Sequence, residues 1–169
     1  MNNELIALRI IHILAGVFWA GTAVYLALIL EPKLRQASDE VETAVLQQVS
    51  KLSSLWITLS AIVTIGGGFA LISRTPGRSF DQLFDNGWGW AIGIGLIASL
   101  AAFFLSGWVG VNTAKLRRAL LTGGGEVEQA ARDLEALIDA CHARIALGSR
   151  INATLVVIAV GSMASARYV

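Results

Sequence analysis

The chain has 169 residues, of which 55% are hydrophobic and 15% charged, and its formal net charge is +1. A soluble domain of this size carries about 25% charged residues, so this composition indicates a protein of the lipid bilayer. The small net charge and the absence of long Lys/Arg runs argue against a nucleic-acid-binding surface. The single cysteine, Cys141, excludes an intrachain disulfide and a cysteine-rich metal site.

Four apolar segments are each long enough to cross the hydrocarbon layer, for which about 20 helical residues suffice. We predict a single domain over residues 1–169 with spans near residues 5–30, 52–73, 88–113 and 149–167. The predicted breaks are Glu31-Pro32-Lys33, Arg74–Arg78 and the basic residues from Lys115 to Arg118. The first segment lacks the basic start of a secretory signal and its apolar run is too long, so we expect the mature protein to keep it.

Two of the connections carry apolar residues at helical spacing between polar positions. They run from Gln36 to Lys51 and from Glu126 to Leu147, and the glycines at 123–125 supply a break before the second. The expected fold is therefore all-α, an integral membrane four-helix bundle with two amphipathic connecting helices. The second of these is able to continue unbroken into the fourth span. The apolar positions are Val41, Val45, Leu46 and Val49 in the first, and Leu134, Leu137, Ile138, Cys141 and Ile145 in the second.

Four crossings place both termini on one side of the membrane. The side of the termini carries Arg9, Arg74, Arg78 and Arg167, and the other side carries Lys33, Arg35, Lys51, Lys115, Arg117, Arg118, Arg132, Arg144 and Arg150. Because cytoplasmic loops carry the excess of Lys and Arg, we expect both termini outside the cytoplasm, in a bacterial inner membrane. Trp88 and Trp90 then belong to the outer aromatic belt. Glycines at positions 16, 21, 66–68, 93, 95, 107 and 110 are expected to let helices approach closely.

One face of the first span combines residues that suit a haem. Arg9, His12, Gly16 and Trp19 follow a helical spacing of three and four residues, so they share a face. The imidazole would ligate iron, the glycine would leave space for a flat ring, and Arg9 would hold a propionate. The alternative is that His12 is an interfacial histidine hydrogen-bonded to a neighbouring carbonyl or to water.

A sixth haem ligand would have to come from a similar depth. Met163 lies four residues before Arg167 on the fourth span, much as His12 lies three residues after Arg9 on the first. Methionine opposite histidine is a known haem ligation, which makes Met163 a candidate. The alternative is a packing role, since a thioether fills gaps readily. A water opposite His12 is also left open.

The second histidine belongs to a different pattern. Glu135, Asp139 and His142 follow one stripe of a predicted helix, and carboxylates with an imidazole can hold a divalent metal. A solvated polar face has the same pattern. No acidic residue or lysine lies in the middle of a span, which disfavours an ion-coupled transporter. No nucleophile–base pair, phosphate loop or dinucleotide motif is present, so the sequence assigns no reaction.

The run from Leu8 to Gly21, with His12 followed by Phe18-Trp19-Ala20-Gly21, resembles the first helix of a superfamily of small bacterial membrane proteins. The superfamily includes copper-resistance D-like proteins, four-helix protoporphyrinogen oxidases and uncharacterised relatives. The closing segment from Arg150 to Tyr168 is similar to that of the uncharacterised branch. The oxidase branch implies haem b at His12, together with a lysine of the third helix. This chain has Lys115 only beyond the end of that span, so the resemblance implies the scaffold and haem rather than the oxidase activity.

The leading hypothesis is a membrane haem-binding redox protein that exchanges electrons with quinol or with a partner at the outer face. An alternative from another class is a non-catalytic membrane module that forms a homo-oligomer or binds a partner or lipid. Copper handling is a third reading. One histidine, one methionine and a distant cysteine make a poor copper site, because soft ligands need to cluster.

Overall fold

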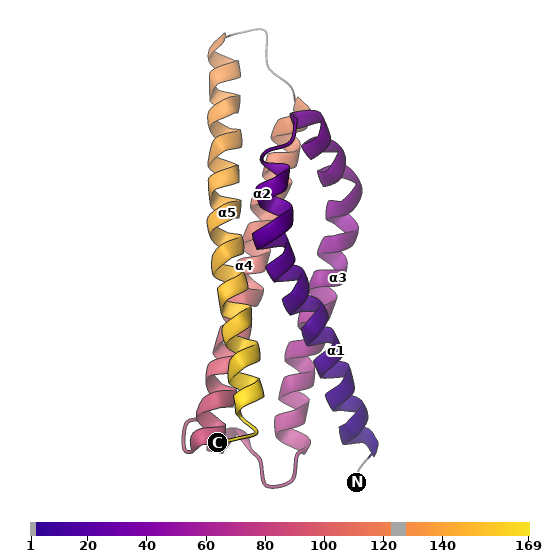
Figure 1. The fold of residues 1–169 in the computed structure, drawn as a ribbon, viewed down its shortest axis with the longest axis vertical. Coiled ribbons are helices and arrows are strands. Elements are labelled where there is room, and N and C mark those ends of the chain that lie inside the picture. Colours follow the sequence, from indigo (N-terminus) through magenta and orange to yellow (C-terminus); the bar gives the residue numbers. More distant parts are fainter. Residues whose placement is uncertain (1–2, 123–127) are drawn as a thin grey trace.

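The computed structural model describes residues 3–122 and 128–169, and every regular element in these ranges is a helix (Figure 1). The order is α1 (Asn3–Tyr25), π-helix η1 (Leu26–Leu30), α2 (Glu31–Leu34), α3 (Asp39–Arg74), 3₁₀-helix η2 (Phe80–Gln82), α4 (Gly87–Thr122) and α5 (Glu128–Ser165). The predicted glycine break at 123–125 and the start of the second connecting segment lie outside the described residues.

Four helical stretches are long and apolar enough to cross a membrane, which confirms the four predicted apolar helices. They are Asn3–Leu34, Leu52–Arg74, Gly87–Leu121 and Gln129–Ser165. Much of their apolar surface faces outward, as Leu14, Phe104 and Val157 illustrate with exposed fractions of 64%, 72% and 59%. Apolar surface left in water costs about 25 cal/mol per Å², so this surface suits an apolar surrounding.

Neither amphipathic connecting segment is a separate helix: this corrects the prediction for the first segment, whereas for the second it agrees with the predicted option of an unbroken helix. The 36-residue α3 and the 38-residue α5 each contain one connecting segment and one span without interruption. At 1.5 Å per residue, helices of this length reach about 54 Å, well beyond the ~30 Å hydrocarbon layer. No proline separates the segments at either junction, so the helical hydrogen-bond ladder continues.

The first span does not end at Glu31-Pro32-Lys33, so this predicted break is wrong by one helical turn. The helix widens to a π-turn at η1, where the Glu31 N–H donates to the Leu26 carbonyl, and α2 then carries the chain to Leu34. Pro32 has no N–H and clashes with the carbonyl four residues earlier in an α-helix. Widening the turn before Pro32 relieves this conflict, and single π-turns of this kind often occur at functional sites.

The helices pack around two layers of buried side chains. Helices α1, α3, α4 and α5 all contribute to the first layer. The second layer is formed by α3, α4 and α5. The first layer is Trp19, Ala23, Ala61, Ala102 and Val156. The second is Leu46, Leu116, Cys141 and Ile145.

Glycine brings α4 and α5 together at one of the predicted positions. A Cβ on Gly95 would lie 2.8 Å from Cγ of Met163, so the thioether side chain fills the space above this glycine. Gly148, which we did not predict, has the same role beneath Trp108 and Val109. Four predicted positions are wrong, because a Cβ there meets nothing within 4 Å among the described residues: Gly21, Gly66, Gly107 and Gly110.

The start of α1 and the end of α5 lie at the same end of the bundle, as an even number of crossings requires (Figure 1). The loop between α3 and α4 closes this end. There the Arg78 guanidinium lies 4.3 Å from the ring centroid of Trp88, and Phe84 meets Trp90 edge to face with centroids 5.0 Å apart. Both tryptophans therefore stand at the start of α4, beside the ends of the chain.

Candidate functional site: a cavity between the helices

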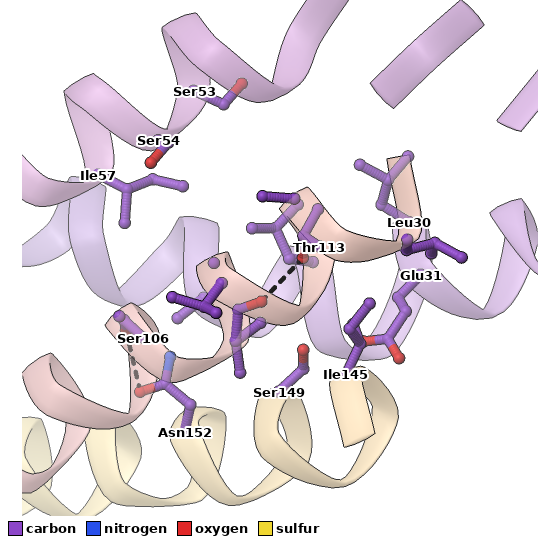
Figure 2. A pocket seen from close by; sticks show the side chains of 18 of the residues that line it. Leu30, Glu31, Ser53, Ser54, Ile57, Ser106, Thr113, Ile145, Ser149 and Asn152 are labelled. Atoms are coloured by element: carbon purple, nitrogen blue, oxygen red, sulfur yellow. Dashed lines mark hydrogen bonds between the residues drawn. The ribbon is translucent and has the colours of Figure 1, made fainter. Parts of the chain in front are cut away.

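A cavity of about 800 Å³ lies between the helices, and it touches both buried layers (Figure 2). Trp19 and Ala61 of the first layer and Leu46, Leu116 and Ile145 of the second line its wall. The remaining wall comes from η1, α2 and the facing turns of α3, α4 and α5. Most lining residues are apolar, and two groups of polar side chains interrupt the apolar wall.

The first polar region lies at the end of the bundle away from the chain termini, where η1 and α2 meet the first part of α3, the last part of α4 and the first half of α5. We call it the ionisable end, defined by Glu31, Arg35, Glu42, Arg117 and His142. Glu31, Glu42, Arg117 and His142 belong to four different helices, Arg35 directly follows α2, and all five residues line the cavity. Sequence analysis singled out only His142 among them for a binding role.

A buried histidine–carboxylate pair forms part of the ionisable end. His142 Nε2 lies 3.0 Å from Oε1 and 3.2 Å from Oε2 of Glu42, and Glu42 is only 5% exposed. The two residues are 100 positions apart in sequence. Because Nε2 faces a carboxylate, it is the nitrogen that carries the proton in this pair. A charge-assisted hydrogen bond of this kind compensates for removing the carboxylate from water.

The predicted metal stripe is arranged differently. His142 turns to Glu42 on α3, while Glu135 and Asp139 of the same helix are exposed. No group of three or more His, Cys, Asp or Glu side chains in the described parts of the chain is placed to hold a metal ion.

Glu31 is the second carboxylate of the ionisable end. It is partly buried, and its Oε1 is an enclosed atom with no hydrogen-bond partner among the described residues. Ser149 lies beside the carboxylate (Figure 2), and Arg35, Arg150 and His142 are close enough to act on its charge. Glu31 directly follows the π-turn and precedes Pro32.

The second polar region lies deeper in the bundle. Trp19 is 2% exposed, and its indole N–H has no hydrogen-bond partner among the described residues. Ser106 on α4 donates to Oδ1 of Asn152 on α5 at 3.3 Å (Figure 2), and both residues line the cavity. This region contains no ionisable group among its lining residues.

His12 lies outside the lining of this cavity and packs on α3. Its Nδ1 lies 2.7 Å from the Thr64 carbonyl, so Nδ1 carries the proton and donates. A Cβ on Gly67 or Gly68 would lie 3.3 Å from atoms of His12, so these glycines provide the space for the imidazole. The hydrogen bond fixes the tautomer and leaves Nε2 as the nitrogen with a lone pair, the form that ligates iron.

The other predicted haem residues have different surroundings. A Cβ on Gly16 would be 3.4 Å from Cγ2 of Thr64, so a threonine occupies the space expected for a flat ring. Trp19 is buried in the first layer and Arg9 is exposed. Met163 packs over Gly95 of α4, whereas His12 packs on α3, so each side chain contacts a different helix.

Sequence reasoning missed Glu31 and Glu42 as site residues. Glu42 lies one helical turn before Leu46, and the pair forms the buried face of this part of α3, while Val41 is 51% exposed. Because Glu42 is acidic, sequence analysis assigned it to the polar face of the helix, and its buried position was missed. For Glu31 the available signal was its position directly before Pro32, where a helix that continues needs a widened turn.

Comparison with known proteins identifies no relative: no family model, no curated protein and no solved structure matches the chain.

Proposed function

We propose that this chain is a multi-pass membrane protein that binds a lipid-soluble, amphiphilic small molecule in the cavity between its helices. The observation that carries the proposal is the cavity of about 800 Å³, bounded by apolar side chains and ending at Glu31 and the Glu42–His142 pair. Small-molecule sites have volumes of about 300–1,000 Å³, mostly apolar walls and a few placed polar groups. This cavity has each of these properties.

Three features support the membrane setting. Four helices have the required length and hydropathy, their large apolar side chains face outward, and the basic residues gather at the end away from the termini. The charge distribution supports an orientation in which that end, with the ionisable residues of the cavity, lies on the cytoplasmic side of a bacterial inner membrane. A reporter enzyme that is active only outside the cytoplasm, fused after Val169, should therefore be active. An inactive fusion would contradict this orientation and indicate the opposite one.

The binding proposal is tested with an uncharged probe, 2-decylnaphthalene. Nanodiscs that contain the protein should retain this probe saturably, approaching one molecule per chain, above the amount that partitions into protein-free discs. The physical reason is that the partly open, largely apolar cavity offers a limited volume per chain, whereas lipid takes up the probe without saturation. Retention equal to that of protein-free discs would contradict the proposal.

Haem binding at His12 is the second candidate, favoured by the Nδ1–H hydrogen bond to the Thr64 carbonyl. This bond holds the imidazole with Nε2 as the lone-pair nitrogen, the state that haem ligation requires. We propose His12 as the axial ligand of a haem b, with electron exchange to quinol or to an outer-face partner as the role. The residues Arg9, Gly16, Trp19 and Met163 enter this proposal from sequence alone.

Protein purified from haem-replete cells should show a Soret band under this second proposal, and His12→Ala should abolish it. His142→Ala, which removes the only other histidine, serves as the control and should leave the band unchanged. A colourless wild-type preparation would remove the haem proposal and leave the binding proposal intact.

A further inference from the structure

We propose that the molecule bound in the cavity carries an uncharged hydroxyl group whose O–H donates a hydrogen bond to Nδ1 of His142. The inference rests on the proposed binding function and names the chemical class of the ligand, a lipid-soluble phenol or alcohol. His142 was predicted as a metal ligand together with Glu135 and Asp139, whereas in this inference its imidazole recognises a ligand of the cavity.

Nδ1 of His142 is a hydrogen-bond acceptor. Nε2 lies 3.0 Å from Oε1 and 3.2 Å from Oε2 of Glu42, so Nε2 carries the proton of the neutral ring. The lone pair is then on Nδ1, because the hydrogen bond of one ring nitrogen decides the state of the other. A carboxylate that accepts from one ring nitrogen also raises the basicity of the second. A group that binds Nδ1 must therefore be a donor.

Nδ1 is accessible, in contrast to the indole nitrogen of Trp19. In the described parts of the chain, the enclosed side-chain atoms without a hydrogen-bond partner belong to Trp19, Glu31 and Gln82. Nδ1 of His142 also has no partner among the described residues, but it is not one of these enclosed atoms, so it has accessible surface. The side chain of His142 is 15% exposed. A molecule is therefore able to reach this nitrogen.

The cavity borders the helix face from which His142 projects. The α5 residues that line the cavity recur at successive turns of the helix: His142, Ile145, Ser149 and Asn152. Glu42, the partner at Nε2, lines the same cavity from α3. A ligand whose polar head occupies the ionisable end therefore has that head beside the imidazole, while its apolar part lies along the remaining wall.

The charges of the ionisable end favour an uncharged donor. Two carboxylates, Glu31 and Glu42, and two guanidinium groups, Arg35 and Arg117, line this end, so their formal charges cancel. No net charge is left there to attract an ammonium or a carboxylate headgroup. A hydroxyl group donates a hydrogen bond without carrying a charge, and its burial is tolerated once it is hydrogen-bonded.

The test compares two probes in nanodiscs, 6-decyl-2-naphthol and its methyl ether, which share the ring, the tail and the oxygen. Only the naphthol has an O–H to donate. After correction for uptake by protein-free discs, the wild-type protein should bind the naphthol about tenfold more tightly than the ether, as one net hydrogen bond predicts. Equal affinities of the wild type for the two probes would overturn the inference.

A double variant, Glu42→Leu with His142→Phe, removes the imidazole without leaving a buried carboxylate unpaired. Apolar residues of similar size often replace a buried ion pair without loss of stability. The double variant should bring the two affinities to within about twofold. Glu40→Leu with Ala143→Phe introduces the same side chains at exposed positions of the same helices, outside the cavity lining, and should keep the preference. A preference that survives in the first double variant would contradict the role of His142.

A second measurement needs no variant. The chain has two histidines of opposite tautomer, with the lone pair on Nδ1 in His142 and on Nε2 in His12. In nitrogen-15 NMR spectra of histidine-labelled protein, the naphthol should move the Nδ1 resonance of His142 towards that of a protonated nitrogen. The ether should not move it, and the His12 resonances should stay unchanged with both probes.

The two possible failures are distinguishable. An Nδ1 resonance of His142 that does not move while the naphthol is bound would overturn the inference and leave the binding function intact. Failure of the wild-type protein to retain the naphthol, the ether and 2-decylnaphthalene above protein-free discs would instead overturn the proposed binding function.

Discussion

Gly110→Leu is expected to weaken binding of 2-decylnaphthalene by at least about tenfold, because the new side chain would occupy the volume that the probe needs. Gly110 lines the cavity, and a Cβ there meets nothing within 4 Å, so the added atoms extend into open space rather than into a neighbouring helix. Leucine is also a better helix former than glycine, by about 0.8 kcal/mol, so α4 should not be weakened. The measurement is saturable probe retention in nanodiscs.

Gly161→Leu is the matched control for this variant. A Cβ on Gly161 also meets nothing within 4 Å, but Gly161 is outside the cavity lining. Its probe affinity should equal that of the wild type. Equal binding by Gly110→Leu and the wild type would show that the probe does not occupy this part of the cavity.

His142→Ala is expected to lower the free energy of unfolding by about 3 kcal/mol, because it leaves a buried carboxylate without its partner. Glu42 is 5% exposed, and both oxygens of its carboxylate lie within hydrogen-bond distance of His142 Nε2. Glu42→Gln should cost less, about 1 kcal/mol, because the amide is uncharged and its oxygen still accepts from the imidazole. Unfolding by an increasing mole fraction of SDS in mixed micelles gives both values.

Asp139→Ala provides the comparison for the pair. Asp139 lies one turn before His142 on α5 and is exposed, so its removal should change stability by less than about 0.5 kcal/mol. Equal losses for His142→Ala and Asp139→Ala would contradict the buried pair as a stabilising contact. The same comparison separates it from the metal stripe predicted on Glu135, Asp139 and His142, in which both residues would be ligands.

The sequence determined that the chain is built from four long apolar helices. The length of each apolar run and the helical spacing of the flanking segments are properties of local sequence, and the required rise per residue is fixed. The same reasoning left open that the second amphipathic segment continues into the fourth span, as α5 does, but it did not join the first segment to the second span, as α3 does. It failed at Pro32, where the sequence shows a helix breaker but not the π-turn that accommodates it.

The composition of the cavity could be decided only by tertiary structure. Glu42 reaches His142 across 100 residues, and His12 reaches the Thr64 carbonyl across 52, so neither contact follows from spacing on one helix. Helical periodicity fixes which residues share a face, but not which face of another helix they meet. That choice depends on how all the helices pack together, and it is this packing that leaves Trp19, Glu31 and the Glu42–His142 pair around one cavity.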